Sequence, residues 1–206
     1  MSKGGLIRSV MTVGGWTLLS RGAGLARDTM MAAYLGSGPV AEAFYVAFSL
    51  PNMFRRFFAE GAFNTAFVPL FSKKLEGGDD PQRFAQDAFS GLAFVVAVFS
   101  AVAMIAMPGL VWLMAAGFAG DERFALAVEY GRITFPYILL ISLASMVSGV
   151  LNANGRFTAA AAAPVLLNLL FIVGMLLGRA FGWDLGLTLA WATPLTGIAQ
   201  LALVWW

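Results

Sequence analysis

The sequence predicts an all-α membrane protein, a polytopic transmembrane helical bundle of about six spanning helices. Hydrophobic residues make up 60% of the 206 residues, and charged residues only 12%. Soluble domains carry about 25% charged residues, and this much apolar surface cannot all be hidden inside a globule of this length. The apolar residues also form six segments, each near the roughly 20 residues that a helix needs to cross a bilayer.

Four of the segments contain long uncharged runs. We expect helices over 86–107, 128–152, 157–178 and 185–206. The first should end at Pro108-Gly109, because this dipeptide marks a turn. These four segments have the length and hydropathy of ordinary spanning helices.

Two earlier segments, 10–35 and 41–71, are long enough to span but carry charges near their middle. A turn at Gly36-Ser-Gly-Pro39 joins them. Their interior charged residues are Arg21, Arg27, Asp28, Arg55, Arg56 and Glu60. Short loops throughout predict an up-down bundle.

We expect residues 1–206 to form a single membrane domain. The amino-terminal segment could be mistaken for a secretory signal, but no clear Ala-x-Ala-like cleavage site follows it, and five more apolar segments do. The last segment runs into Trp205-Trp206 with no lysine or arginine after it. We therefore expect this chain to be the front part of a longer protein.

Several classes of function conflict with the composition. The chain has no cysteine and no histidine, so Cys/His zinc sites and Ser-His-Asp or Cys-His catalysis are not expected within it. We expect no metal, no cofactor and no enzyme activity. The net charge is only +2 and the basic residues are scattered, so nucleic acid is not an expected partner.

The basic residues also predict an orientation. Cytoplasmic loops of membrane proteins carry an excess of lysine and arginine. With the amino terminus inside, the cytoplasmic basic residues are Lys3, Arg8, Lys73, Lys74, Arg83 and Arg156, and those of the outside loops are Arg123 and Arg179. The loop 73–83 is thus expected in the cytoplasm.

The interior arginines are the candidate site residues. One arginine at the centre of a spanning helix costs about 2.5–3.5 kcal/mol on insertion scales. Arg56 and Glu60 are four apart and are expected to pair, and Asp28 lies seven residues after Arg21 on the same helix face. Arg27 and Arg55 have no obvious partner on their own helices.

Two interpretations of these charges stay open. They could only brace one helix against another, which explains Arg56 and Glu60 well. The surplus of arginine over acid instead favours a water-filled cavity for an anionic ligand, because guanidinium groups match phosphate oxygens. On this interpretation the arginines without an obvious partner on their own helices, Arg27 and Arg55, would contact the ligand.

Several motifs resemble those of the MurJ (MviN) lipid II flippase family of the MOP exporter superfamily. They are SRGAGLARD at 20–28, AEAFYVAF at 41–48, LPNMFRRFFAEGAF at 50–63, ITFPYILLISLAS at 133–145, LNANGRF at 151–157 and APVLLN at 163–168. The resemblance covers nearly the whole chain in order. At Glu42 many relatives are expected to carry aspartate, which keeps the charge.

The resemblance implies two six-helix lobes and an extra helix pair around a cationic cavity, with this chain as the amino-terminal lobe. It implies that the partners are lipid II, an undecaprenyl-diphosphate-linked muropeptide, the membrane lipid and the missing carboxy-terminal lobe. The implied function is lipid II transport to the periplasmic leaflet by alternating access, in cell wall synthesis. Arg21, Arg27 and Arg55 match family arginines implicated in substrate binding or function, so the resemblance implies that they bind substrate. Asp28, Arg56 and Glu60 match further charged positions of the motifs and are expected to be supporting charged residues of the cavity. The resemblance also implies a location in the bacterial inner membrane.

Other functions remain as alternatives. A multidrug or polysaccharide-lipid exporter of the same superfamily would share the fold, although a cationic-drug exporter is expected to have an acidic cavity. A membrane enzyme acting on lipid-linked sugars usually needs acidic clusters for a metal or a base. A scaffold in wall synthesis should tolerate replacement of the arginines.

Overall fold

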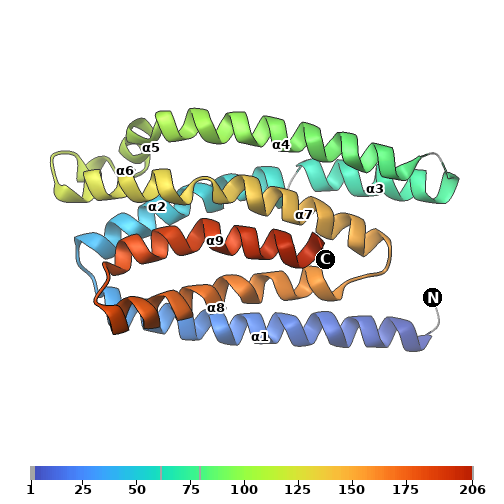
Figure 1. Ribbon diagram of the computed structural model, residues 1–206, viewed down its shortest axis with the longest axis horizontal. Coiled ribbons are helices and arrows are strands. Elements are labelled where there is room, and N and C mark those ends of the chain that lie inside the picture. The colour runs from blue at the N-terminus through green and yellow to red at the C-terminus, as the bar shows by residue number, and fades with distance from the viewer. Residues whose placement is uncertain (1–2, 61, 79, 206) are drawn as a thin grey trace.

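Helices that run along one long axis make up the computed structural model of the protein (Figure 1). The structure describes the backbone of residues 3–60, 62–78 and 80–205, and the side chains of 11–58, 65–78 and 80–205. Within these ranges the elements are α1 (Lys3–Leu35), α2 (Pro39–Arg55), the π-helical turn η1 (Arg56–Glu60), α3 (Ala62–Gly77), α4 (Pro81–Ile105), α5 (Met107–Met114), the 3-10 turn η2 (Ala116–Phe118), α6 (Glu122–Thr134), α7 (Tyr137–Ala153), α8 (Thr158–Phe181) and α9 (Leu185–Trp205).

The fold class is all-α, as predicted. Four helical stretches in the described residues are long and apolar enough to cross a membrane, and they are α4, α6 with α7, α8 and α9. Helix α1 carries Arg21, Arg27 and Asp28, and α2 has only 17 residues. These two depend on the rest of the bundle to place their polar groups away from lipid.

The predicted helix over 41–71 is divided in the structure. Helix α2 ends at Arg55, the π-helical turn η1 follows, and α3 begins at Ala62. A π-helical turn pairs residues five apart instead of four, so the spacing used to predict an Arg56–Glu60 pair does not carry through η1. The Glu60 side chain lies outside the described side chains, and the predicted pair stays untested.

Proline accounts for two further differences from the predicted boundaries. The segment predicted as 128–152 is two helices, because Pro136, which has no N–H to donate, lies between α6 and α7. Helix α4 ends at Ile105, two residues before the predicted end at 107, and Pro108 lies in the first turn of the next helix, α5, where a missing N–H costs nothing.

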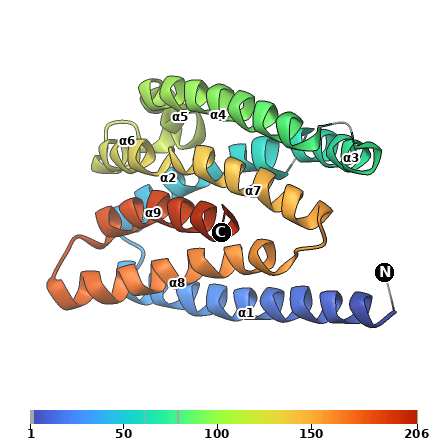
Figure 2. The same ribbon diagram turned by 45° about the vertical axis from the view of Figure 1, so that its right-hand side comes forward.

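Each helix packs along particular neighbours in the bundle. Helix α1 lies along α8 and runs in the same direction, as both views show (Figures 1 and 2). Helix α9 packs between α8 and α7, and α2 packs on α6. Phe44 and Phe48 of α2 contact Phe171 of α8, with ring centroids 6.2 and 5.4 Å apart. The rings join the α2 and α7 side of the bundle to the α1 and α8 side.

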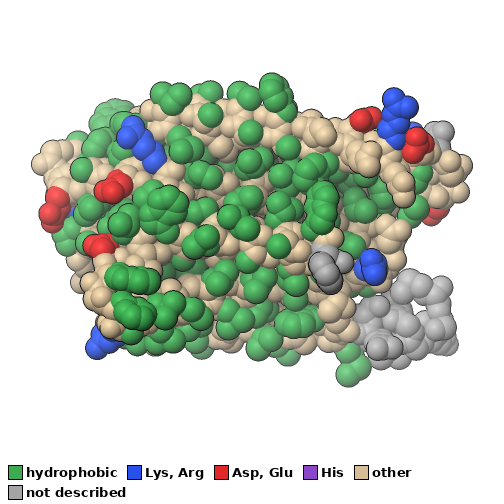
Figure 3. Space-filling model, viewed as in Figure 1, with side chains coloured by type: hydrophobic (Ala, Val, Ile, Leu, Met, Phe, Trp, Pro, Cys, Tyr) green, Lys and Arg blue, Asp and Glu red, His purple; other side chains and the backbone are tan. Residues whose placement is uncertain are grey.

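The surface fits lipid better than water. Hydrophobic side chains cover the middle of the face in Figure 3, and most of the charged side chains visible there lie toward the two ends. On α4, Phe94 is 71% exposed and Ile105 is 80% exposed. Apolar exposure on this scale is unusual for a soluble monomer, and the protein is a membrane protein.

Candidate functional site: a cavity with two arginines

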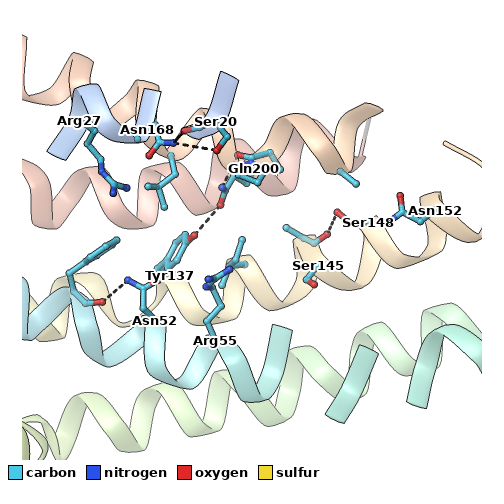
Figure 4. A pocket seen from close by; sticks show the side chains of 18 residues that line it. Ser20, Arg27, Asn52, Arg55, Tyr137, Ser145, Ser148, Asn152, Asn168 and Gln200 are labelled. Atoms are coloured by element: carbon cyan, nitrogen blue, oxygen red, sulfur yellow. Dashed lines mark hydrogen bonds between the residues drawn. The ribbon is translucent and has the colours of Figure 1, made fainter. Parts of the chain in front are cut away.

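A cavity of about 630 Å³ lies between two groups of helices. One wall comes from α1, α8 and α9, and the other from α2 and α7 (Figure 4). Its charged lining residues are Arg27 and Arg55, and its uncharged polar ones are Ser20, Asn52, Tyr137, Ser145, Ser148, Asn152, Asn168 and Gln200. Two cations from different helices therefore share one polar space inside a membrane protein.

Arg27 reaches the cavity from α1. Ser20, Gly24 and Arg27 are spaced four and three apart, so they lie on one helix face. The Arg27 side chain is 20% exposed, and its guanidinium carbon lies 6.0 Å from the centroid of the Phe171 ring. The arginine is thus held at the wall of the cavity and not in the acyl region.

The expectation that Arg27 has no partner on its own helix is wrong. Its Nε and Nη2 both donate to Oδ1 of Asp28, at 2.9 and 2.7 Å. Adjacent residues on a helix point about 100° apart, but the arginine side chain is long enough to turn back to its neighbour. The two bonds use two of the five N–H groups that a guanidinium offers.

Arg55 reaches the cavity from the last position of α2, just before η1. It is half-buried, and Asn52, one turn earlier, lines the same wall. The Asn52 side-chain amide donates to the carbonyl of Phe48 at 2.9 Å. In Figure 4, Arg27 and Arg55 extend from opposite walls toward the space between them.

The other predicted site residues lie elsewhere. Arg21 is exposed and is not among the residues that line the cavity, because it follows Ser20 directly and points about 100° away from it. Arg56 is also exposed, and Asp28 is 64% exposed beside Arg27. The structure thus brings Arg27 and Arg55 to one cavity, and a substrate role for Arg21, Arg27 and Arg55 stays a prediction.

Sequence reasoning missed Asn168 and Gln200 as polar residues of the cavity. Asn168 of α8 donates from Nδ2 to the Ser20 carbonyl at 2.9 Å, and a Cβ on Gly24 would lie 3.5 Å from that Nδ2. Gln200 of α9 donates to the Ala163 carbonyl at 2.8 Å and accepts from the Tyr137 hydroxyl at 3.3 Å. The available signal was a lone amide inside an otherwise apolar segment, where interhelical hydrogen bonds are common.

A cluster of charged residues lies at one end of the bundle. Arg123, at the start of α6, contacts Glu42 of α2 and Asp121, both at 2.6 Å. The hydrogen bond from Arg123 lowers the pKa of the Asp121 carboxyl below its usual range. The cluster ties α2 to the connection before α6.

Arg132 was also missed by the sequence reasoning. Its Nε donates to the carbonyl of Met104 near the end of α4 at 3.2 Å.

Comparison with known proteins decides the family. The family model described as "Lipid II flippase MurJ" matches residues 31–205. The chain belongs to the MurJ family. A Rhizobium tropici protein named "Probable lipid II flippase MurJ" is 48% identical over 207 residues, which cover 97% of this chain and 39% of that protein.

Comparisons with two further MurJ proteins support the same family. The lipid II flippase MurJ of Burkholderia cenocepacia is 43% identical over 198 residues, covering 95% of this chain and 38% of its own length. A solved MurJ structure in an inward closed conformation superposes with a TM-score of 0.77 at 28% identity, covering 92% of this chain and 40% of the MurJ chain. This chain therefore spans about two fifths of the length of the MurJ proteins that it matches.

Proposed function

We propose that this chain is the amino-terminal lobe of a transporter that moves lipid II from the cytoplasmic to the periplasmic leaflet for cell wall synthesis. The observation that carries the proposal is the pair Arg27 and Arg55, which line one cavity from two separate helices. Membership in the MurJ family supports the same substrate. Transport of this kind makes and breaks no covalent bond.

The two arginines would hold the diphosphate of the substrate. Guanidinium groups form paired, charge-assisted hydrogen bonds with phosphate oxygens. Arg27 and Arg55 would bind the anion in one conformation and release it as the lobes rock, since an alternating-access protein binds its substrate differently in its two states. Arg21, exposed on α1, is a further candidate ligand where the missing lobe would complete the site.

A multidrug exporter fits the cavity less well. Both charged lining residues are cations, and they would repel a cationic drug. An exporter of another saccharide linked to a lipid diphosphate would use the same two arginines. A comparison of lipid II binding with the binding of a cationic dye distinguishes an anion transporter from a drug exporter.

We propose that the amino terminus lies in the cytoplasm of a bacterial inner membrane. The α3–α4 and α7–α8 connections lie at the same end of the bundle as the amino terminus (Figure 1), and Lys73, Lys74, Arg83 and Arg156 lie in or beside those connections. Arg123 and Arg179 belong to the opposite end. The unequal distribution of basic residues supports this orientation.

Replacing Arg27 in the full-length protein tests the proposal. Arg27→Ala should abolish complementation of a flippase-depleted strain at a normal membrane protein level. Arg27→Lys should retain little activity, because lysine is a point charge without a planar fork. Arg179→Ala is the matched control, since Arg179 lies on the Tyr34 ring away from the cavity, and it should complement.

The competing explanation is that Arg27 serves only to pair with Asp28. Asp28→Asn would then lose as much complementation as Arg27→Ala, and Arg27→Lys would largely suffice. We expect Asp28→Asn to retain more activity than Arg27→Ala. Full complementation by Arg27→Ala at a normal protein level would overturn the proposal.

A further inference from the structure

The arginine cavity has a second part that carries no charge. Ser145, Ser148 and Asn152 of α7 line it, and their spacing of three and four residues places them on one helix face. In Figure 4 they form a row that leads away from Arg55 toward the end of α7. Ser145 and Ser148 are half-buried and Asn152 is exposed, so the row runs outward from the interior.

The α8 side of the same cavity includes two small lining residues. They are Ala160 and Ala163, whose side chains are single methyl groups. The charged lining residues, Arg27 and Arg55, precede the row along the cavity (Figure 4). One cavity thus joins a cationic part to a neutral part rich in hydroxyl and amide groups.

We propose that the face formed by Ser145, Ser148 and Asn152 is a subsite for the neutral, hydroxyl-bearing saccharide of the headgroup. The inference rests on the proposed function, in which Arg27 and Arg55 hold the adjoining diphosphate. A saccharide joined directly to that diphosphate would extend along the row. These three residues would then determine which headgroup is accepted, while the arginines recognise only the anion.

The hydrogen-bonding capacity of the row suits a sugar. The Ser148 hydroxyl donates to the carbonyl of Ala144 at 2.8 Å, so its oxygen is left to accept from a sugar hydroxyl. The Asn152 amide can both donate and accept. Serine often bonds to its own helix in this way without any ligand, so the test needs a serine of α7 that does not line the cavity.

Ser142 provides that control. It lies on α7 with 1% of its surface exposed, and its hydroxyl has no hydrogen-bond partner among the described residues. It is not a lining residue of the cavity. Ser142→Ala therefore makes the same chemical change on the same helix, away from the proposed subsite.

The experiment measures the binding of two probes to the full-length protein in lipid nanodiscs. One probe is a polyprenyl diphosphate that carries a disaccharide, and the other is the bare polyprenyl diphosphate. The triple variant Ser145→Ala, Ser148→Ala, Asn152→Ala should lose about tenfold or more in affinity for the first probe, since each neutral hydrogen bond contributes roughly two- to tenfold. Its affinity for the bare probe should not change.

The control variants should separate a subsite from a general disturbance. Ser142→Ala should bind both probes normally, and Ser148→Thr, which keeps the hydroxyl, should retain disaccharide binding. If the triple variant does not fold, Ser148→Ala and Asn152→Ala measured singly give the same comparison. Equal losses for both probes, or no loss for either, would overturn the subsite.

Failure of the subsite is distinguishable from failure of the proposed function. Arg27→Ala should lower the affinity of the protein for both probes, because both contain the diphosphate. If Arg27→Ala binds both probes normally, the proposed function fails whatever the α7 variants do. If Arg27→Ala lowers the affinity for both probes and the α7 variants do not selectively lower the affinity for the disaccharide probe, only the subsite proposal fails.

Discussion

Arg27 and Asp28 are sequence neighbours with different surroundings. Arg27 is 20% exposed at the cavity, and Asp28 is 64% exposed beside it. The aspartate fixes one edge of the guanidinium and offsets part of the cost of a cation in the bilayer. The unused N–H groups can then contact a ligand with little further ordering, which is how preorganisation raises affinity.

At the opposite end from the amino terminus, we predict that Arg123→Gln lowers the thermal stability of the purified protein. The change removes the contacts to Glu42 and Asp121 that tie α2 to the start of α6. The effect should be small, because exposed ion pairs contribute little. Thermal unfolding of both proteins in detergent measures it.

The stability difference between wild type and Arg123→Gln should also depend on pH. The pKa of Asp121 is lowered in the folded protein, so its stabilising contribution is present above the unfolded-state pKa and is lost as the pH falls through the folded one. The stability difference between wild type and Arg123→Gln should therefore shrink under strongly acidic conditions. A difference that grows on acidification would contradict this assignment.

At the scale of elements, α7 and α9 approach closely through a glycine. A Cβ on Gly197 would lie 2.8 Å from the Cβ of Leu140, so a larger residue must push the helices apart. We predict that Gly197→Ala costs about 1–3 kcal/mol, a typical penalty for overpacking, and reduces the folded fraction in membranes.

Gly174 of α8 is the matched control for that change. A Cβ there would meet Ala192 and Thr188 of α9 at 3.7 Å, which is ordinary contact. Gly174→Ala should keep a normal folded level in a fluorescence-detected size-exclusion assay. Equal behaviour of the two variants would show that the α7–α9 approach is not tight.

Hydropathy predicted some elements better than others. Helices α4, α8 and α9 follow from uncharged runs, because such runs need only length and apolarity to span. The π-helical turn after Arg55 and the break at Pro136 were not predicted, since a single long apolar segment fits one helix as well as two. Tertiary contacts decide between these forms.

The site was predictable in part for a related reason. The cost of charge in hydrocarbon pointed to the interior arginines as a group, Arg27 and Arg55 among them, without any structure. It could not separate Arg27 from Arg21, because that depends on which face of α1 packs on α8. Asn168 and Gln200 carry no charge, so they gave only a weak signal among so many apolar residues.

For the whole molecule, the connections between helices predict a labelling pattern. Ser37 lies in the α1–α2 turn and Glu76 in the last turn of α3, and both are exposed. That turn and the end of α3 lie at opposite ends of the bundle (Figure 1), and the chain has no native cysteine. In the full-length protein, an impermeant thiol reagent should label Ser37→Cys in intact cells. Glu76→Cys should react only after the cells are opened, and the reverse pattern would invert the orientation.

We propose that Arg27 and Arg55 act on one anion within the one cavity that they line. The most direct measurement is the dissociation constant of a polyprenyl diphosphate for the full-length wild type, Arg27→Gln, Arg55→Gln, the double variant and the control Arg179→Gln. Charge-assisted hydrogen bonds are worth about 1.5–3 kcal/mol each, so loss of a bidentate contact should weaken binding about a hundredfold or more. We expect this loss for each cavity variant, a loss in the double variant that is smaller than the product of the two single losses, and no loss for Arg179→Gln. Wild-type affinity in both single cavity variants, or an equal loss in the control, would contradict it.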